Sequence, residues 1–454
     1  MTSGPNADER SLLSLSRSQR RLLFGLLLVL AFCFRLMVGL CSDFHTEVQD
    51  EKQIYLIGLK FYTTGKWPYF GPDVTHTIQI PGALQGLIVG LPFYLLPLPE
   101  APFLLLNLLT FAALCFFAWY CCRRLPEIPK WLVWSWLLTA PWVLGLSTQV
   151  YNPSYVLFGA IMFFVAAIET YPFLSRNLIP VRWANFMMGF GLFWIMQFHL
   201  SFVDLLPFVG LSFYFQIRRD GIKVWRALTC FLGGAIIPAS VLLPTFLKFG
   251  LTGGEGNIND AIQVSQANIL RNLNVVEGVL GRFLSFASYE LPRFIGRNTE
   301  ARLTFLREHH WLIPFVVFLT VVGIAQSILL LLLWFRRKNQ PPDWPAMKYF
   351  TLATVLLLYL SFIFSLKSPA SHTFYFALPV ATLYSFYCWR DFMTKKVWRT
   401  FALIVIVSGI IFQAGLAAHN YHRTSFYVDR SLIQQAIDQK DYRVLGERRA
   451  GSRY

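Results

Sequence analysis

Long apolar stretches, separated by short polar and basic segments, run through most of the chain. Eleven of them are close to the ~20 residues that a helix needs to cross the hydrocarbon core of a bilayer. They cover residues 22–40, 101–122, 131–147, 154–174, 183–198, 201–217, 227–246, 311–335, 349–366, 373–389 and 401–418. The pattern predicts an all-α, polytopic membrane protein with about eleven transmembrane helices.

The apolar run 82–98 is ambiguous, because it could be a twelfth span or a helix on the membrane surface. If it lies on the surface, the short loops on one side and the N-terminal tail carry 21 basic residues, and the opposite short loops carry only Lys367. Short cytoplasmic loops are enriched in Lys and Arg. Prolines also interrupt the run. We therefore expect a juxtamembrane helix here, with the N-terminus inside and the C-terminus outside.

This topology divides the chain into three parts. A cytoplasmic tail (1–20) precedes the transmembrane domain (21–418), and a short outer tail (419–454) follows it. Two long loops, 41–98 and 248–310, face the outside, and the second contains an amphipathic-looking segment at 262–286. The outer tail is too short to fold as an independent domain.

The composition agrees with this assignment. Only 14% of the 454 residues are charged, against about 25% in an average soluble domain. The net charge of +16 lies largely in loops that set topology, so it does not indicate a nucleic-acid partner. The seven cysteines show no metal-binding or disulfide spacing. A soluble enzyme, a disordered chain and a nucleic-acid binder are excluded, and no metal site is predicted.

Carboxylates concentrate in the first outer loop. Asp43, Glu47, Asp50 and Glu51 fall within nine residues, although the chain has only 24 acidic residues. A carboxylate at the membrane surface can act as general base towards a hydroxyl or amine, or can hold a divalent cation. The alternative is a solvated acidic loop without a role in chemistry. No other cofactor is indicated.

The motifs after these carboxylates carry a family resemblance. Tyr55 follows the Asp50-Glu51 pair, and then come a Gly-x-Trp step at 65–67, which ends at Trp67, and the sequence Ile-Pro-Gly-Ala-Leu at 80–84. In order and spacing these motifs resemble the first outer loop of the C-type, polyprenyl-phosphate-dependent glycosyltransferases (GT-C). That superfamily includes the aminoarabinose transferases and the protein O-mannosyltransferases.

The resemblance extends through the spans to Trp389. Asn152 stands where the superfamily often has an acidic residue in its second outer loop, and Tyr375 lies in a segment (371–379) similar to its Tyr-Leu-Leu-Pro span entry. The basic residue that often precedes the Pro-Pro-Leu-like motif is replaced by Gln79 and Ile80. The lipid phosphate must therefore be met by other groups. The candidates are His76, Lys367, His372, Arg271, Arg282, Arg293 and Arg297. For each of the four arginines, the favoured alternative is attraction to the anionic headgroups of membrane lipids.

The resemblance implies a membrane enzyme that transfers a hexose or pentose from a polyprenyl-phosphate donor. The acceptor would be a lipid, glycan or protein of the cell envelope. The enzyme would lie in the bacterial inner membrane, with its active site facing the periplasm or the exterior. Asp50 would be the general base and Glu51 would orient it or the acceptor. Tyr55, Asn152 and Tyr375 would bind substrate. Trp67 could stack on the sugar or belong to an interfacial aromatic belt. The alternative functions are a lipid-linked sugar flippase or polysaccharide transporter, and a structural subunit of an envelope-assembly complex.

A few ionisable residues lie in or beside the apolar runs, where such groups are functional candidates. His199 and Asp204 flank the start of one span on the outer side. They either bind substrate or form a His–Asp pair that holds a helix turn. Arg35 is expected to extend outward from the first span or to pair with Asp43 or Glu47. Glu169 is assigned no role.

Overall fold

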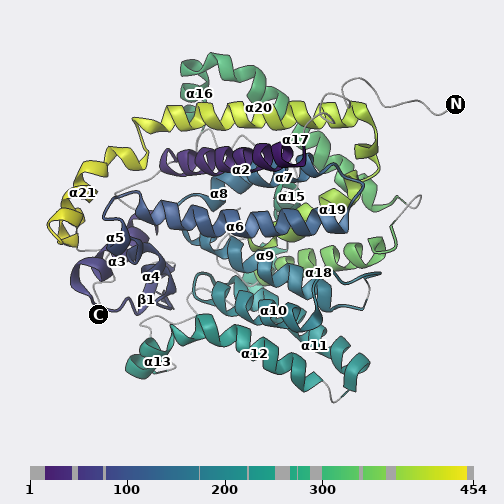
Figure 1. Ribbon diagram of the computed structural model, residues 1–454, viewed down its shortest axis with the longest axis horizontal. Coiled ribbons are helices and arrows are strands. Elements are labelled where there is room, and N and C mark those ends of the chain that lie inside the picture. Colours follow the sequence, from purple (N-terminus) through teal and green to yellow (C-terminus); the bar gives the residue numbers. More distant parts are fainter. Residues whose placement is uncertain are drawn as a thin grey trace.

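The computed structural model describes residues 16–42, 50–74, 78–172, 174–221, 224–250, 266–273, 275–286, 299–336, 341–363 and 375–446. In this part the protein is a bundle of helices, most of which run along one common direction (Figure 1). Among the described residues, seven helical segments are long and apolar enough to cross a membrane. They are α2 (Arg17–Leu40), α6 (Ala101–Arg124), α9 (Asn152–Thr170), η1 with α11 (Leu200–Asp220), η4 with α17 (His310–Trp334), α18 (Trp344–Ile363) and α20 (Lys396–Tyr421).

The other predicted spans contain helices that are broken or shorter. Helices α7 (Lys130–Thr139) and α8 (Pro141–Ser147) are separated at Ala140. Helices α12 (Val224–Ser240) and α13 (Leu243–Phe249) are bent by 65°, shortly after Pro238, whose missing N–H weakens the helix. Helices α10 (Val181–Met196) and α19 (Leu378–Trp389) are uninterrupted but short. The helical architecture is thus confirmed, several described helices fit membrane spans, and the number eleven stays a prediction.

Most of the first long loop forms a cap at one end of the bundle, on the left of Figure 1. The cap contains α3 (Asp50–Thr64), the antiparallel strands β1 (Phe70–Val74) and β2 (Ile78–Pro81), α4 (Leu84–Gly90) and α5 (Pro92–Leu95). The strands were not expected from the sequence. The α4–α5 segment would be only about 18 Å long as a helix, too short for a core of about 30 Å. This length fits a juxtamembrane element.

The second long loop also contains helices. They are α14 (Gln266–Asn272), α15 (Val275–Phe286) and α16 (Thr299–Glu308). Val279 and Phe283 of α15 are buried, and α15 packs against α17, α18 and α19. The amphipathic pattern at 262–286 therefore marks, in its described part, a helix that lies against the bundle with one apolar face.

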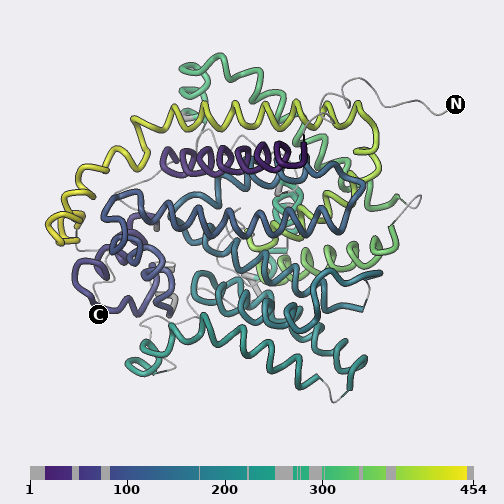
Figure 2. The backbone as a smooth tube through the Cα atoms, in the orientation of Figure 1, coloured from purple at the N-terminus to yellow at the C-terminus, as the bar shows by residue number. Residues whose placement is uncertain are grey.

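The C-terminal segment packs on the cap. Helix α20 runs along the bundle and the chain then turns through η7 (Phe426–Val428) into α21 (Arg430–Asp438) and η8 (Tyr442–Leu445), as Figure 2 shows. The Phe426 ring lies against the rings of Tyr55 and Phe103, and the Arg430 guanidinium pairs with Glu100. Residues 419–446 thus fold by docking on the first long loop.

At the opposite end of the bundle, ion pairs connect the basic loops to one another. Arg124 forms ion pairs with Glu169 and Asp343, Arg336 pairs with Asp391 beside η6 (Phe392–Thr394), and Arg390 approaches Glu127 to 3.7 Å. These contacts gather the ends of α6, α9, α17 and α19. We call this the basic end and the opposite one the cap end. Glu169, which we assigned no role, is fully buried and is the partner of Arg124.

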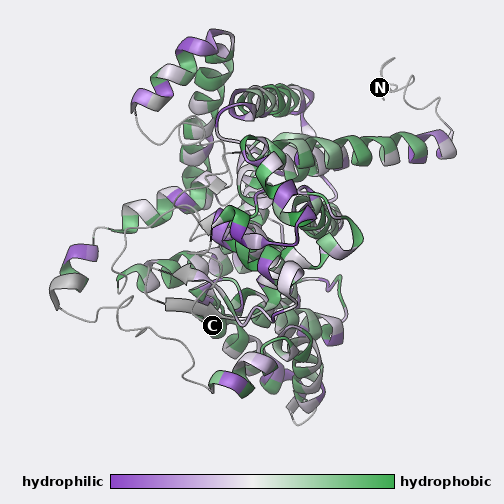
Figure 3. Cartoon of the chain, turned by 90° about the vertical axis from the view of Figure 1, so that its left-hand side faces the viewer, coloured by the Kyte–Doolittle hydropathy of each residue, from purple (hydrophilic) through white to green (hydrophobic). Residues whose placement is uncertain are grey.

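The first helix exposes much of its apolar surface. The N-terminal half of α2 stands out from the bundle in Figure 3, where its colour is mostly hydrophobic. Leu22 has 76% of its surface exposed and Val29 58%. A run of exposed Leu and Val is costly in water but is stable in contact with lipid chains, so this helix fits a membrane environment.

Two glycines let α10 and α12 approach closely. A Cβ added to Gly234 of α12 would lie 1.9 Å from the Phe186 carbonyl oxygen, and one added to Gly189 of α10 would lie 2.0 Å from that of Phe231. Small residues at helix crossings allow backbones to touch, and dispersion and weak polar contacts then hold the helices together. The glycines therefore fix the distance between α10 and α12.

Replacing Gly234 by Leu is expected to destabilise the folded protein by about 1–3 kcal/mol, because the side chain would force two backbones apart. Thermal unfolding in detergent, followed by circular dichroism, measures this effect as a lower midpoint. Gly233→Leu is the matched control, since a Cβ on Gly233 meets nothing within 4 Å. Equal midpoints for the two variants would show that the α10–α12 contact does not limit stability.

Candidate functional site

The two proposed catalytic carboxylates stand in the first turn of α3, which begins at Asp50. Carboxylates are favourable there because the free N–H groups of a helix N-terminus carry partial positive charge. The Glu51 side chain is buried, with 8% of its surface exposed. The Asp50 side chain and residues 43–49 lie outside the described part of the chain, so the general-base assignment of Asp50 stays a prediction.

Tyr55 lies one turn further along α3 and fixes the cap to the bundle. Its hydroxyl donates a hydrogen bond to the Pro99 carbonyl at 2.6 Å, and its ring packs against Phe93. Burial, and next the nearby Glu100 charge, raise the pKa of Tyr55 well above its ordinary value, so the phenol keeps its proton. This contact positions α3 against the start of α6, and the substrate-binding role proposed for Tyr55 stays a prediction.

Asn152 belongs to a buried group of amide side chains. The Gln85 amide of α4 donates to Asn152 Oδ1 of α9 at 2.7 Å, and the Gln197 amide donates to the Pro238 carbonyl at 2.6 Å. Gln85 Oε1 and Gln197 Oε1 are buried and accept no hydrogen bond from any described residue. Such acceptors are costly in an apolar setting and can accept hydrogen bonds from hydroxyl groups.

Gly82 directly follows strand β2 of the cap and lies against Gln197. Gly82 has φ of +155°, and a Cβ added there would lie 3.0 Å from Gln197 Cβ. Both features require glycine. Gln85 and Gln197 were not predicted as site residues, although a Gln within an apolar run is a visible signal in the sequence.

Trp67 lies in the link between α3 and β1. Its side chain is half-buried, and its indole N–H is buried without an acceptor among the described residues. The next residue, Pro68, contacts α4: a Cβ added to Gly86 would lie 2.6 Å from Pro68 Cβ. Trp67 and Gln85 are therefore the chain neighbours of Pro68 and Gly86, which pack against each other within the cap.

His199 is the N-cap residue of a 3-10 helix. Its Nδ1 accepts the backbone N–H of Ser201 at 3.1 Å, at the start of η1 (Leu200–Leu205). Asp204 lies in the same 3-10 helix and is half-buried. His199 thus helps to hold this turn, and the His199–Asp204 pair of the alternative interpretation stays a prediction. Substrate binding by His199 and Asp204 stays a prediction.

Arg35 is fully buried, so the expectation that it extends outward is wrong. It donates through Nη2 to Thr110 Oγ1 at 3.2 Å and to Ser147 Oγ at 2.9 Å. Its Nε and Nη1 contact no acceptor within the described residues. Tyr375 is also fully buried, and its hydroxyl donates to the Val143 carbonyl at 3.4 Å, next to Ser147 on α8.

A buried guanidinium needs an anion. Pairing of Arg35 with Asp43 or Glu47 falls outside the described residues, as do His76, Lys367, His372, Arg293 and Arg297. Arg271 and Arg282 are described and lie on α14 and α15. The structure therefore joins Gln85 to Asn152 and places Arg35 among hydroxyl groups. Among the described residues, no contact gathers the predicted site residues into one cluster.

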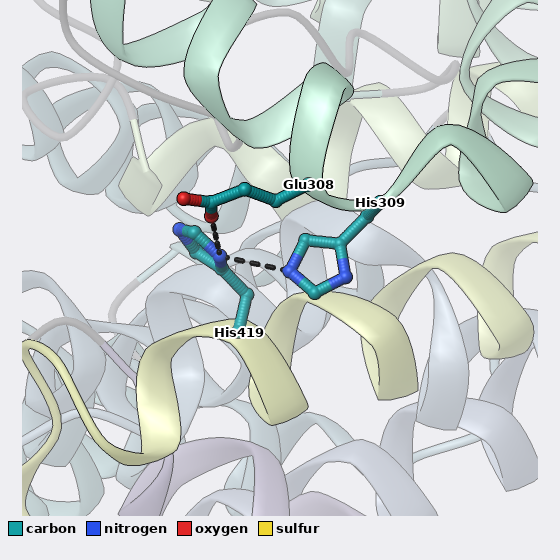
Figure 4. A group of neighbouring side chains, drawn as sticks. All are labelled: Glu308, His309 and His419. Carbon is teal, nitrogen blue, oxygen red and sulfur yellow. Dashed lines mark hydrogen bonds and ion pairs between the residues drawn. The ribbon is translucent and has the colours of Figure 1, made fainter.

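Three other side chains, missed in the sequence, have the chemistry to hold a metal ion. Glu308, His309 and His419 place one ligand atom each within 4.8 Å of the others, where the end of α16 meets the end of α20 (Figure 4). Because 110 residues separate the two histidines, no local spacing could have indicated them.

Comparisons of this chain with protein-family models, with curated proteins and with solved structures found no match.

Proposed function

We propose that this protein is an integral membrane glycosyltransferase that moves a sugar from a polyprenyl-phosphate donor to an envelope acceptor at the outer face of the membrane. One observation carries the proposal. Helix α3, which begins with Asp50 and Glu51, is packed directly on α4, which carries Gln85: a Cβ added to Gly58 would lie 2.4 Å from the Val89 side chain. The helix that begins with the two carboxylates is thus packed against the helix that carries Gln85, whose amide bonds Asn152.

The charge distribution supports the orientation. Basic loops gather at the basic end, which by the positive-inside rule would face the cytoplasm. The cap, with Asp50 and Glu51 in its first helix, would then face the periplasm or exterior of a bacterial inner membrane. All eleven predicted apolar runs contain a described helix, so eleven crossings would place the N-terminus inside and residues 419–446 on the cap side.

The proposed reaction is a single displacement. Asp50 takes the proton of the acceptor hydroxyl or amine while that oxygen or nitrogen bonds to the anomeric carbon. The bond between the anomeric carbon and the phosphate oxygen breaks, and the polyprenyl phosphate leaves with the bonding electrons. The transition state resembles an oxocarbenium ion, as in glycosidases. Glu51 would orient Asp50 or the acceptor, and inversion at the anomeric carbon is implied by the family resemblance.

The leaving phosphate needs a positively charged partner. Arg35 is a candidate for this role, which the sequence alone did not suggest. It is buried and offers Nε and Nη1 donors that no described residue accepts. A guanidinium matches the geometry of phosphate oxygens. The free oxygens of Gln85 and Gln197 could in turn accept hydrogen bonds from sugar hydroxyls. His76, Lys367 and His372 remain further candidates for the phosphate.

Proteoliposomes separate this function from its rivals. The purified protein is reconstituted with a panel of labelled hexosyl and pentosyl polyprenyl phosphates and an envelope extract as the source of acceptor. We expect loss of donor label and its appearance in an acceptor, both dependent on the protein. Movement of labelled lipid across the bilayer without transfer would instead establish a flippase or transporter. Neither activity, with the full donor panel, would support a structural subunit.

A further inference from the structure

Two imidazoles and a carboxylate converge at the contact between α16 and α20 (Figure 4). His309 Nε2 lies 2.9 Å from His419 Nδ1, and His419 Nδ1 lies 3.5 Å from Glu308 Oε2. We propose that Glu308, His309 and His419 form a binding site for a zinc ion. The site uses none of the residues assigned to sugar transfer, so it does not depend on that proposed function.

The distances suit a tetrahedral ion. Zinc bonds of about 2.0–2.1 Å to nitrogen and oxygen place neighbouring ligand atoms roughly 3.3 Å apart. The two measured separations, 2.9 and 3.5 Å, lie on either side of this value. The Glu308 side chain is 33% exposed, so it can rotate to complete the set. Two imidazoles and one carboxylate form a known zinc donor set in which water or an outside ligand takes the fourth position.

The surroundings hold the ligands in place. Phe305 is fully buried, and its ring centroid lies 5.2 Å from that of His309 and 4.9 Å from that of His419. Arg423 Nη2 donates to Glu308 Oε1 at 2.8 Å, which leaves Oε2 directed at His419. Metal-binding carboxylates are commonly oriented by such hydrogen bonds. Both histidines are half-buried, so an ion can enter from solvent.

The ligand chemistry selects the kind of ion. Mg²⁺ and Ca²⁺ prefer oxygen ligands, whereas imidazole suits Zn²⁺ and neighbouring transition metals. Without an ion, the 2.9 Å between His309 Nε2 and His419 Nδ1 requires one of the two nitrogens to donate an N–H hydrogen bond to the other. With zinc bound, both facing nitrogens must be unprotonated. His309 then carries its proton on Nδ1 and His419 on Nε2.

Zinc at this position would join the second long loop to the end of α20. The chain continues from α20 into the segment that packs on Tyr55 of the cap through Phe426 and pairs with Glu100, at the start of α6, through Arg430. The ion would therefore stabilise a connection between the two long loops. The competing account is a histidine pair held by a hydrogen bond alone, with Glu308 bound to Arg423.

Zinc titration distinguishes the two accounts. The full-length protein, purified in detergent without a histidine tag and stripped with EDTA, is titrated calorimetrically with Zn²⁺, and Co²⁺ absorption reports the ligand geometry. We expect one ion per chain and at least about a 100-fold loss of affinity in both His309→Ala and His419→Ala. His310→Ala and His422→Ala are matched controls, because these exposed histidines are chain neighbours of the site and should leave binding unchanged.

Thermal unfolding checks that the variants are folded and supplies a second readout. Zn²⁺ should raise the unfolding midpoint of the wild-type protein and of both controls, since a ligand that binds only the native state stabilises it. It should leave the His309→Ala and His419→Ala midpoints unchanged. The proposal is overturned if the wild-type protein binds no Zn²⁺ at micromolar concentration, or if both ligand variants bind it with wild-type affinity.

Discussion

Replacing Asp50 by Asn is expected to lower sugar transfer by about 10²- to 10⁴-fold, the usual contribution of a general base. The substitution keeps the shape of the side chain and removes its ability to take a proton. Because Asp50 stands in the first turn of α3, loss of its charge should cost the helix less than about 1 kcal/mol. Transfer rates in proteoliposomes and thermal unfolding in detergent measure the two effects separately.

Two further variants make the Asp50 result specific. Glu300→Gln removes an exposed carboxylate on α16 and should leave transfer unchanged. Glu51→Gln should lower kcat less than Asp50→Asn does, and should raise KM if Glu51 orients the acceptor. Wild-type turnover by Asp50→Asn would remove Asp50 from the mechanism, whatever the effect of Glu51→Gln.

Replacing Glu169 by Leu is expected to destabilise the protein by about 3–5 kcal/mol, the usual cost of leaving a buried charge without its partner. Glu169 is fully buried and bonded to Arg124, and its Oε2 accepts the backbone N–H of Leu178 at 2.8 Å. Among the described residues Arg124 would keep one acidic partner, Asp343 at 3.5 Å, besides hydrogen bonds to the Arg176 carbonyl and the Tyr120 hydroxyl. The measurement is the unfolding midpoint in detergent and the yield of monodisperse protein.

A second substitution and a control test the reason for this loss. Arg124→Met combined with Glu169→Leu should recover part of the stability, because both members of the closest pair are removed and only Asp343, which keeps the Ser175 N–H, loses its guanidinium partner. Asp220→Asn, which weakens a partly exposed pair with Arg219, should cost less than about 1 kcal/mol. If Glu169→Leu is no more harmful than Asp220→Asn, the Arg124–Glu169 pair does not hold the basic end together.

Hydrophobic periodicity and charge placement were enough to predict the helical architecture and the gathering of basic loops. Both are local properties: a long apolar run favours a helix, and Lys and Arg are read off the loops. The breaks near Pro141 and Pro238 shorten the helices of two apolar runs, and α10 and α19 are short without a break, so fewer single helices reach full span length than there are apolar runs. The β1–β2 pair was missed because Gly71 and Pro72 within β1 weaken any strand signal.

The site was harder to predict because its contacts join distant segments. Gln85 and Asn152 are 67 residues apart, and Arg35 meets Ser147 from 112 residues away. A single sequence shows which polar residues occupy apolar runs and leaves their partners open. The expectation for Arg35 failed for this reason, since side-chain length suggested exposure and the packing of α2 on α6 and α8 buried it.

The position of the donor phosphate tests the central claim most directly. A structure of the wild-type protein in lipid nanodiscs with a polyprenyl phosphate would show it without knowledge of the acceptor. We predict that the phosphate lies at the cap end, within ion-pair distance of Arg35, His76, Lys367 or His372 and beside the first turn of α3. A phosphate bound among the arginines of the basic end, or no bound polyprenyl chain at saturating concentration, would contradict transfer at the outer face.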